Sequence, residues 1–120
     1  MAVRALRGAT TIESDDVAQI TVRTKELLTE MLDRNSVDKE HLISILFTAT
    51  DDIHALFPAA AARELGLGDV PLICARELDI EGATKLCIRL MVHLETDIPR
   101  AELRHIYQYG AKGLRDDLPG

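Results

Sequence analysis

Residues 85–95 constrain the fold most, because their side chains alternate in character without a break. One set is wholly aliphatic: Leu86, Ile88, Leu90, Val92 and Leu94. The other set is mixed: Lys85, Cys87, Arg89, Met91 and His93. This period of two predicts a β-strand with one buried aliphatic face. Arg89 then projects from the middle of the strand on the opposite face.

A second pattern, at helical spacing, runs from about residue 14 to residue 35. We expect Ser14 to cap a long amphipathic helix, followed by Asp15 and Asp16, whose charges suit a helix N-terminus. The side chains predicted to face the core are Val17, Ile20, Thr21, Thr24, Leu27, Leu28, Met31 and Leu32. Those predicted to face outward are Arg23, Lys25, Glu26, Glu30 and Asp33.

Further strands are predicted at residues 2–12, 42–50, 71–75 and 103–109. In the first of them, Gly8 indicates a bulge or a close backbone approach. Pro58 is expected to open a short helix that ends at Gly66. The order β-α-β-α-β-β-β predicts one α+β domain over residues 1–120, a single mixed sheet with its helices on one side. Residues from about 112 to 120 are expected to form a flexible tail.

The uncovered face of this sheet suggests an assembly of subunits. The strand predicted at residues 85–95 carries apolar side chains on both faces, whereas the two predicted helices cover only one face. A second copy of the chain would cover the other face, so we hypothesise a homo-oligomer.

The composition of the chain excludes several classes of protein. A chain of 120 residues and 13.3 kDa buries roughly two-thirds of its unfolded surface in one core. Its net charge of −6 argues against a nucleic-acid partner, which requires an excess of Lys and Arg. No apolar run approaches the ~20 residues that cross a bilayer, so we expect no membrane association. Cys74 and Cys87 form no CxxC motif or disulfide framework, which favours a cytoplasmic protein.

Familiar catalytic motifs are missing from the sequence, including GxSxG, the P-loop, GxGxxG after a strand and HExxH. The four histidines lack metal-ligand spacing, so a zinc site is not favoured. Cys74 has no base that the sequence identifies nearby, and a packed thiol is the better interpretation. The residues therefore do not favour a bound metal ion.

The placement of three arginines is unusual. Arg7 and Arg89 lie inside apolar strand segments, and Arg63 lies in an alanine-rich helix. Burying a guanidinium is costly unless it meets an anion. The spacing alone favours structural salt bridges with Glu77, Glu81 or aspartates. If several arginines converge instead, they form a pocket for a small polyanionic metabolite.

Seven short motifs occur in order along the chain: RGATT at 7–11, TATDDIHALFPA at 48–59, AREL at 62–65, VPLIC at 70–74, KLCIR at 85–89, RHIY at 104–107 and LRDDL at 114–118. Together they resemble the monofunctional chorismate mutases of the trimeric pseudo-α/β-barrel class, and the resemblance covers essentially the whole chain. It implies conversion of chorismate to prephenate, towards phenylalanine and tyrosine, without metal or organic cofactor. It also implies a homotrimer with active sites between neighbouring subunits.

The resemblance implies a role for four residues of a catalytic centre. Arg7 resembles the arginine that grips a substrate carboxylate, and Arg89 the one that donates to the ether oxygen of the breaking C–O bond. Glu77 resembles the carboxylate that binds the ring hydroxyl, with Cys74 beside it. Tyr107 resembles the tyrosine that touches the side-chain carboxylate.

The resemblance also implies the surroundings of the substrate. Phe57, Ala59, Leu72 and Ile73 would form apolar and backbone walls. Arg63, Leu114 and Arg115 would form a rim that closes over the ligand. Two positions depart from the family pattern: Ala60 stands where lysine is frequent, and Ile73 where a hydroxyl-bearing residue is sometimes found.

Two other classes of function stay open from the residues alone. One is a non-catalytic trimer that binds a small carboxylate ligand. The other is a structural oligomer whose arginines pair internally, which predicts no carboxylate-binding cleft.

Overall fold

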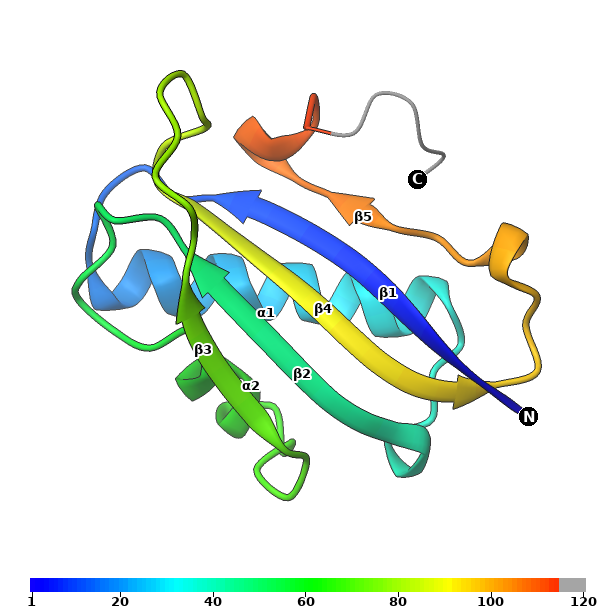
Figure 1. The fold of residues 1–120 in the computed structure, drawn as a ribbon. Helices are drawn as coiled ribbons and strands as arrows, with labels where there is room; N and C mark the ends of the chain where they lie inside the picture. The colour runs from blue at the N-terminus through cyan, green and yellow to red at the C-terminus, as the bar shows by residue number, and fades with distance from the viewer. Residues whose placement is uncertain (115–120) are drawn as a thin grey trace.

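The computed structural model describes residues 1–114, which form one five-stranded mixed sheet with two α-helices on one of its faces (Figure 1). In chain order the elements are β1 Ala2–Thr11, α1 Val17–Arg34, β2 Leu42–Ala49, α2 Ala59–Glu64, β3 Leu72–Arg76, β4 Cys87–Thr96 and β5 Ile106–Tyr107. Short 3-10 turns lie at Lys39–His41, Arg100–Glu102 and Tyr109–Ala111. The predicted order, the single mixed sheet and its one long and one short helix are confirmed.

The strand that alternates most regularly in sequence lies at the centre of the sheet. The strand order is β3-β2-β4-β1-β5. β4 is antiparallel to both β1 and β2, while β3 is parallel to β2 and β5 is parallel to β1. The aliphatic side chains of β4 are buried against the helices: Ile88, Leu90, Val92 and Leu94. The predicted buried face is confirmed for these four residues, whereas Leu86, the fifth, precedes β4, has a φ of 47° and is only partly buried.

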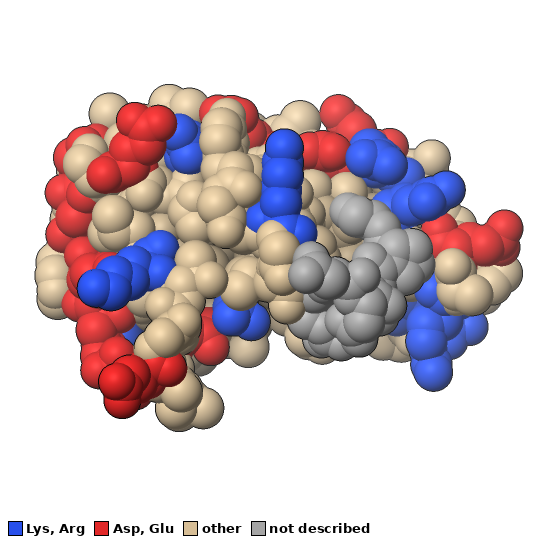
Figure 2. Space-filling model, turned by 90° about the horizontal axis from the view of Figure 1, so that it is seen from above, with Lys and Arg blue, Asp and Glu red and all other residues tan. Residues whose placement is uncertain are grey.

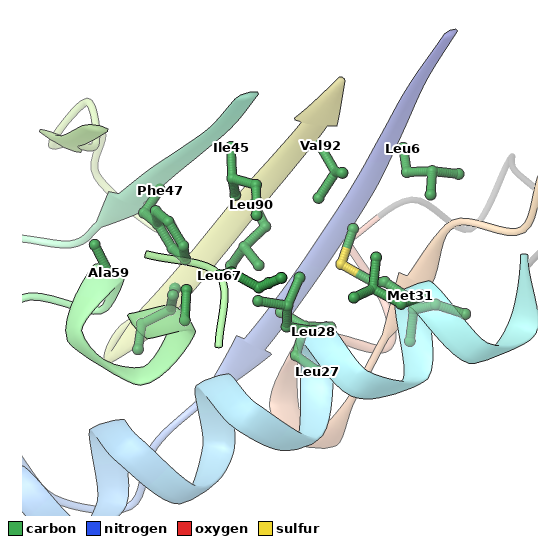
Figure 3. Packing of buried hydrophobic residues seen from close by; sticks show 14 of the residues in the cluster. Leu6, Leu27, Leu28, Met31, Ile45, Phe47, Ala59, Leu67, Leu90 and Val92 are labelled. Atoms are coloured by element: carbon green, nitrogen blue, oxygen red, sulfur yellow. The ribbon is translucent and has the colours of Figure 1, made fainter. Parts of the chain in front are cut away.

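The helix α1 lies against β1, β5 and α2, and Figure 3 shows its side chains pointing towards the sheet. Leu27, Leu28 and Met31 of α1 point into the core shared with the sheet. A Cβ atom added to Gly8 would overlap the sulfur of the buried Met31 side chain, so any larger residue here would displace Met31 or the helix. The predicted close backbone approach at Gly8 is confirmed.

The start of α1 differs from the prediction. Asp16, not Ser14, is the N-cap, and its Oδ1 accepts a hydrogen bond from the Gln19 amide at 2.8 Å. The Ser14 hydroxyl instead donates to the other Asp16 oxygen at 2.5 Å, so it supports the cap from outside the helix. Val17 therefore belongs to the first turn, where its side chain is 54% exposed rather than buried.

Arg23 was predicted to face outward and is only 8% exposed. Its guanidinium donates to the Thr11 carbonyl at 2.7 Å and pairs with Glu13 at 3.2 Å. It also lies over the ring of Tyr109, 3.5 Å from the ring centroid. A long side chain can bury its stem when its charged end finds such partners, and periodicity does not reveal them.

The last predicted strand, residues 103–109, is shorter than expected. Only Ile106 and Tyr107 pair, with Gly8 and Ala9 of β1. The strand ends there because Tyr109 has a φ of 52°, outside the extended region, and begins a 3-10 turn. Residues 112–114 continue from this turn, and the rest of the predicted tail lies outside the described residues.

The face of the sheet opposite the helices is uncovered in the protomer. Val3, Leu46 and Ile73 are exposed on it. No helix within residues 1–114 has the length and apolar character needed to cross a membrane.

Candidate active site

A row of side chains crosses four strands on the open face of the sheet. In register, Thr48 of β2 lies opposite Arg89 of β4, Arg89 opposite Ala9 of β1, and Ala9 opposite Tyr107 of β5. Paired residues point to the same side of a sheet. Arg7, two residues before Ala9, points to this side as well. The pairing thus brings residues from the two ends of the chain together.

These side chains surround a cleft of about 190 Å³. Its polar lining is Arg7, Thr48, Glu77, Arg89 and Tyr107, and its apolar lining is Gly8, Ala9, Leu46, Leu90 and Met91. Four predicted site residues therefore meet in one place. The two arginines are diagonal neighbours on adjacent antiparallel strands, a separation of roughly 7–8 Å between backbones.

Ala9 creates the hollow between the charged groups. It is buried, and it stands between Arg89 and Tyr107 in the row. A larger side chain at this position would project into the space between the guanidinium and the phenol. The small residues of the RGATT motif thus make room for a ligand.

Glu77 is held in a fixed orientation at the edge of the cleft. Its amide donates to the Ala49 carbonyl at 2.9 Å, which continues the pairing of β3 with β2. One of its carboxylate oxygens, Oε2, accepts a hydrogen bond from the Thr48 hydroxyl at 2.6 Å. The same oxygen lies 3.6 Å from the Nε of Arg89. The salt bridge expected under the structural interpretation therefore exists.

This ion pair does not satisfy the Arg89 guanidinium. The Arg89 Nε is buried and has no hydrogen-bond partner within the described residues. Arg7 has no carboxylate within ion-pair distance in the same part of the chain. Two guanidinium groups therefore face one carboxylate in the cleft, which leaves an excess positive charge suited to an anion.

The positive charge of the cleft contrasts with the rest of the molecule. The whole chain has a net charge of −6. Figure 2 shows acidic side chains gathered mostly at one end of the molecule, while basic side chains stand in the middle and gather towards the other end. An anionic ligand is therefore attracted locally rather than by the overall charge.

Cys87 lies beside this site as an uncharged group. It is buried at the start of β4, opposite Thr11 of β1. Burial raises the pKa of the Cys87 thiol, although the nearby Arg89 opposes this shift. The thiol stays protonated at neutral pH and leaves the Arg89 charge available to a ligand.

The remaining predicted site residues lie elsewhere in the protomer. Phe57 and Cys74 line a second cavity, of about 510 Å³, together with residues 53–56 and 75–76. The Cys74 side chain is on the helix side of β3, opposite Phe47, so it does not face the cleft. Phe57 is 71% exposed.

The other predicted wall and rim residues are not gathered at either cavity. Ala59 is buried in α2, and Arg63 is exposed on the same helix. Leu72 packs against the core, whereas Ile73 is 64% exposed on the open face. Leu114 is partly buried in the last described turn, and Arg115 lies outside the described residues.

Sequence reasoning missed six of the cleft residues: Gly8, Ala9, Leu46, Thr48, Leu90 and Met91. Thr48 carries a signal, because it and Ser44 are the two hydroxyl residues of a strand whose other residues are apolar. Its role in orienting Glu77 depends on the pairing of β2 with β3, which the sequence does not display. Within residues 1–114, no three His, Cys, Asp or Glu side chains are grouped so that they could hold a metal ion.

Comparison with known proteins identifies the class to which this fold and cleft belong. The family model of chorismate mutase type I matches residues 3–118, so the chain belongs to the type I chorismate mutases, which are isomerases. The chorismate mutase AroH of Bacillus subtilis is 43% identical over 98% of this chain and 94% of its own length. The chorismate mutase AroH of Thermus thermophilus is 42% identical over 97% of this chain and 96% of its own length.

A solved structure shares the fold. The chorismate mutase of Clostridium thermocellum superimposes with a TM-score of 0.89 and 41% sequence identity, covering 91% of this chain and 97% of that one. The match extends over nearly all of both chains, so the two share the whole arrangement of sheet and helices.

Proposed function

We propose that the protein binds chorismate in the cleft formed by Arg7, Glu77, Arg89 and Tyr107 and rearranges it to prephenate there. The observation that carries this assignment is the placement of two guanidinium groups on adjacent strands around one small cleft. Chorismate has two carboxylates, and guanidinium groups match carboxylates in shape and charge.

The reaction is a concerted, unimolecular [3,3] rearrangement and requires no proton transfer. An enzyme accelerates it by holding the enolpyruvyl side chain over the ring in the compact reactive conformation. It also accelerates the reaction by placing fixed positive charge where negative charge develops. In the transition state the C–O bond breaks ahead of C–C bond formation, so that charge appears on the ether oxygen.

In this proposal Arg89 stabilises the charge on the ether oxygen. The residue lies in the central strand β4, whose backbone is paired on both sides. Its Nε is held near Glu77 at 3.6 Å, so the guanidinium is oriented before the substrate arrives. A group oriented in advance binds the transition state better than the ground state, and this raises kcat.

The other three residues bind the substrate. Glu77 has one oxygen occupied by Thr48 and faces the ring hydroxyl of chorismate with the other. Arg7 and Tyr107 bind carboxylates whose charge changes little in the reaction. They contribute to affinity and to the choice of conformation.

We also propose that the protein is a homotrimer with its active sites between subunits. The exposed apolar residues Val3, Leu46 and Ile73 on the open face support an interface there. The exposed residues Phe57, Arg63 and Ile73 would then contribute side chains to the cleft across subunit boundaries. Leu114 and Arg115 would belong to the rim, and Ala59, Leu72 and Cys74, which pack on the core side, would contribute through the backbone. We further propose that residues 1–120 form one domain. We also propose that the protein is located in the cytoplasm, where its two free thiols remain reduced.

The test is consumption of chorismate by the purified protein, followed by its ultraviolet absorbance. Arg89→Ala, purified in the same way, controls for contaminating activity. Activity in the wild type that disappears in the variant supports the proposal. Tight binding of a dicarboxylate without turnover would instead favour the non-catalytic carboxylate-binding trimer, and absence of both would favour the structural oligomer.

A further inference from the structure

The strand that carries Tyr107 is held weakly by the sheet itself. β5 consists of Ile106–Tyr107 at the edge of the sheet, and within residues 1–114 it pairs with Gly8 and Ala9 alone. The next amide, of Gln108, donates to the Ala9 carbonyl at 3.0 Å. So short an edge strand supplies few hydrogen bonds. The position of Tyr107 therefore depends on what holds the chain before and after it.

Before β5, the end of α1 holds the chain. The Asn35 side chain donates to the Arg104 carbonyl at 2.9 Å and accepts from the Arg104 amide at 2.7 Å. Asn35 is buried, and its amide also donates to the Met31 carbonyl at 2.8 Å. The chain before β5 is therefore fixed by the Asn35 amide group, whose nitrogen and oxygen both form hydrogen bonds.

After β5, the outer face of α1 holds the chain through charged groups. The Gln108 side chain donates to Glu30 at 2.6 Å, and the Tyr109 hydroxyl donates to Glu26 at 2.6 Å. In Figure 1 this segment runs along β1 beyond the sheet edge, and α1 crosses behind the strands. These contacts therefore join the segment after β5 to α1, which lies on the face of the sheet opposite the cleft.

Arg23 completes this attachment under the Tyr109 ring. Its guanidinium lies 3.5 Å from the ring centroid and is itself fixed by the Thr11 carbonyl and by Glu13. A cation so placed attracts the face of an aromatic ring. Tyr109 is therefore bound at its ring and at its hydroxyl by two different residues of α1.

The backbone at Tyr109 is strained. Its φ is 52°, a conformation that a bulky residue rarely adopts and glycine adopts freely. Such strain persists only where surrounding contacts compensate for it, and it is frequent at functional sites. Here the compensation is supplied by Arg23 and Glu26, together with the Gly110 amide, which donates to Thr11 at 2.9 Å.

We propose that Tyr109, held by Arg23 and Glu26, is a positioning residue that sets the place of Tyr107 in the substrate cleft. The inference rests on the proposed function, because it assumes that Tyr107 binds a substrate carboxylate. Only Gln108 separates the two tyrosines, so a displacement of the Tyr109 backbone is passed to Tyr107. Tyr109 itself does not line the cleft.

The expected kinetic effect is on binding. Since Tyr107 contacts a group whose charge changes little in the reaction, loosening it weakens substrate binding more than it slows the chemical step. We expect Tyr109→Ala to raise KM for chorismate about tenfold while kcat stays within about twofold of the wild type. Tyr109→Phe keeps the ring over Arg23 and loses only the hydrogen bond to Glu26, so its KM should rise by about threefold.

Lys25→Met is the matched control. It removes a basic side chain from the same helix, but one that pairs with Glu64 of α2 rather than with the C-terminal segment. Its KM should equal that of the wild type. Arg23→Met changes the net charge by the same amount and should raise KM as Tyr109→Ala does.

Hydrogen exchange at the Gln108 amide, which donates to the Ala9 carbonyl at 3.0 Å, gives a readout that does not depend on turnover. The proposal requires faster exchange in Tyr109→Ala than in the wild type, with the amides of β4 unchanged. Faster exchange with unchanged KM would overturn the positioning role while leaving the proposed function intact. Unchanged exchange would show that Tyr109 does not hold the segment of Tyr107 in place, whether or not the wild type converts chorismate.

Discussion

At the scale of single residues, the cleft depends on charges that are only partly neutralised. Arg89 has one carboxylate neighbour, Glu77, and its Nε has no hydrogen-bond partner within the described residues. Leaving a charged donor buried and unsatisfied is unfavourable in the free protein. The Arg89 side chain as a whole is 43% exposed and lines the cleft, so its guanidinium can still donate to a substrate oxygen.

The first prediction concerns Arg89. We expect Arg89→Ala to lower kcat on the order of a hundred- to a thousandfold, equivalent to ~3–4 kcal/mol, with a smaller change in KM. The physical reason is that the guanidinium interacts most strongly with charge that exists only in the transition state. Steady-state kinetics measure both constants. A variant that retains near-normal kcat would exclude Arg89 from the electrostatic role.

The second prediction concerns the ionisation of Tyr109. The hydrogen bond to Glu26, followed by partial burial and the charge of Glu26, raises the pKa of Tyr109 above its ordinary value of 10.0, while Arg23 opposes the shift and Glu13 adds to it. Because the folded pKa is the higher one, the protonated phenol stabilises the fold fully below pH 10.0, and this stabilisation is lost as pH rises through the folded pKa.

The absorbance of tyrosinate measures this shift directly. The chain has two tyrosines and no tryptophan, so Tyr107→Phe leaves Tyr109 as the sole tyrosine. In this background, Glu26→Gln should bring the titration midpoint down towards the ordinary value. Identical midpoints with and without the Glu26 charge would contradict the assigned cause.

At the scale of secondary-structure elements, the site depends on how closely α1 approaches β1. Gly8 makes this approach possible, because its neighbours across the interface are Met31 and Leu27. Gly8 lies between Arg7 and Ala9, both of which line the cleft on the other face of the same strand. Packing of α1 against Gly8 therefore fixes the position of β1, and with it the positions of Arg7 and Ala9 on the open face.

The third prediction tests this packing. We expect Gly8→Ala to lower the free energy of unfolding by about 1–3 kcal/mol, because the added methyl group overlaps the Met31 sulfur. Urea denaturation measures the change. Gly68→Ala is the control, since a Cβ atom there meets no other atom within 4 Å and should leave stability nearly unchanged. Equal stability of Gly8→Ala and the wild type would show that α1 can move away at no cost.

At the scale of the whole molecule, a single protomer presents an incomplete site. Its cleft is open on the uncovered face of the sheet, and the predicted wall and rim residues around Phe57 and Arg63 lie apart from it. An assembly of identical subunits would cover the exposed face and bring the two groups together. This is the physical argument for the proposed homotrimer.

The fourth prediction concerns this assembly. Sedimentation equilibrium should give about three times the chain mass of 13.3 kDa at micromolar concentration. A mass equal to one chain would contradict the proposal.

Mixing of inactive subunits provides the fifth prediction. Arg89→Ala and Arg63→Ala chains, each impaired alone, should regain activity when they are unfolded and refolded together. Shared sites would then include some with both native arginines, contributed by different chains. If the mixture is no more active than the separate variants, each site is built within one subunit.

Much of the fold follows from local patterns. The alternation in residues 85–95 and the helical stripe around Leu27 and Leu28 were sufficient to predict β4 and α1, since period alone decides which side chains can share a buried face. The prediction was wrong at the N-cap, at Val17, at Arg23 and in the length of β5. Partners outside the local pattern, Thr11, Glu13 and Tyr109, decided the burial of Arg23. At the helix start the cap is Asp16 rather than Ser14, which also moves Val17 into the first turn.

The candidate site was predicted from ordered motifs rather than from physical reasoning about the residues. The resemblance singled out Arg7, Glu77, Arg89 and Tyr107, and the structure places these four around one cleft. The residues by themselves left salt bridges and a ligand pocket as competing interpretations. The structure contains both, because Arg89 pairs with Glu77 and also faces the cleft.

The sequence by itself determined which segments are helices and strands and which of their faces are buried. The tertiary structure alone decided that Thr48, Arg89, Ala9 and Tyr107 form one row, and that Tyr109 is fastened to α1. The physical reason is that periodicity is a property of neighbouring residues. Strand order and register depend instead on hydrogen bonds and packing between segments far apart in the chain, which only the folded molecule brings into contact.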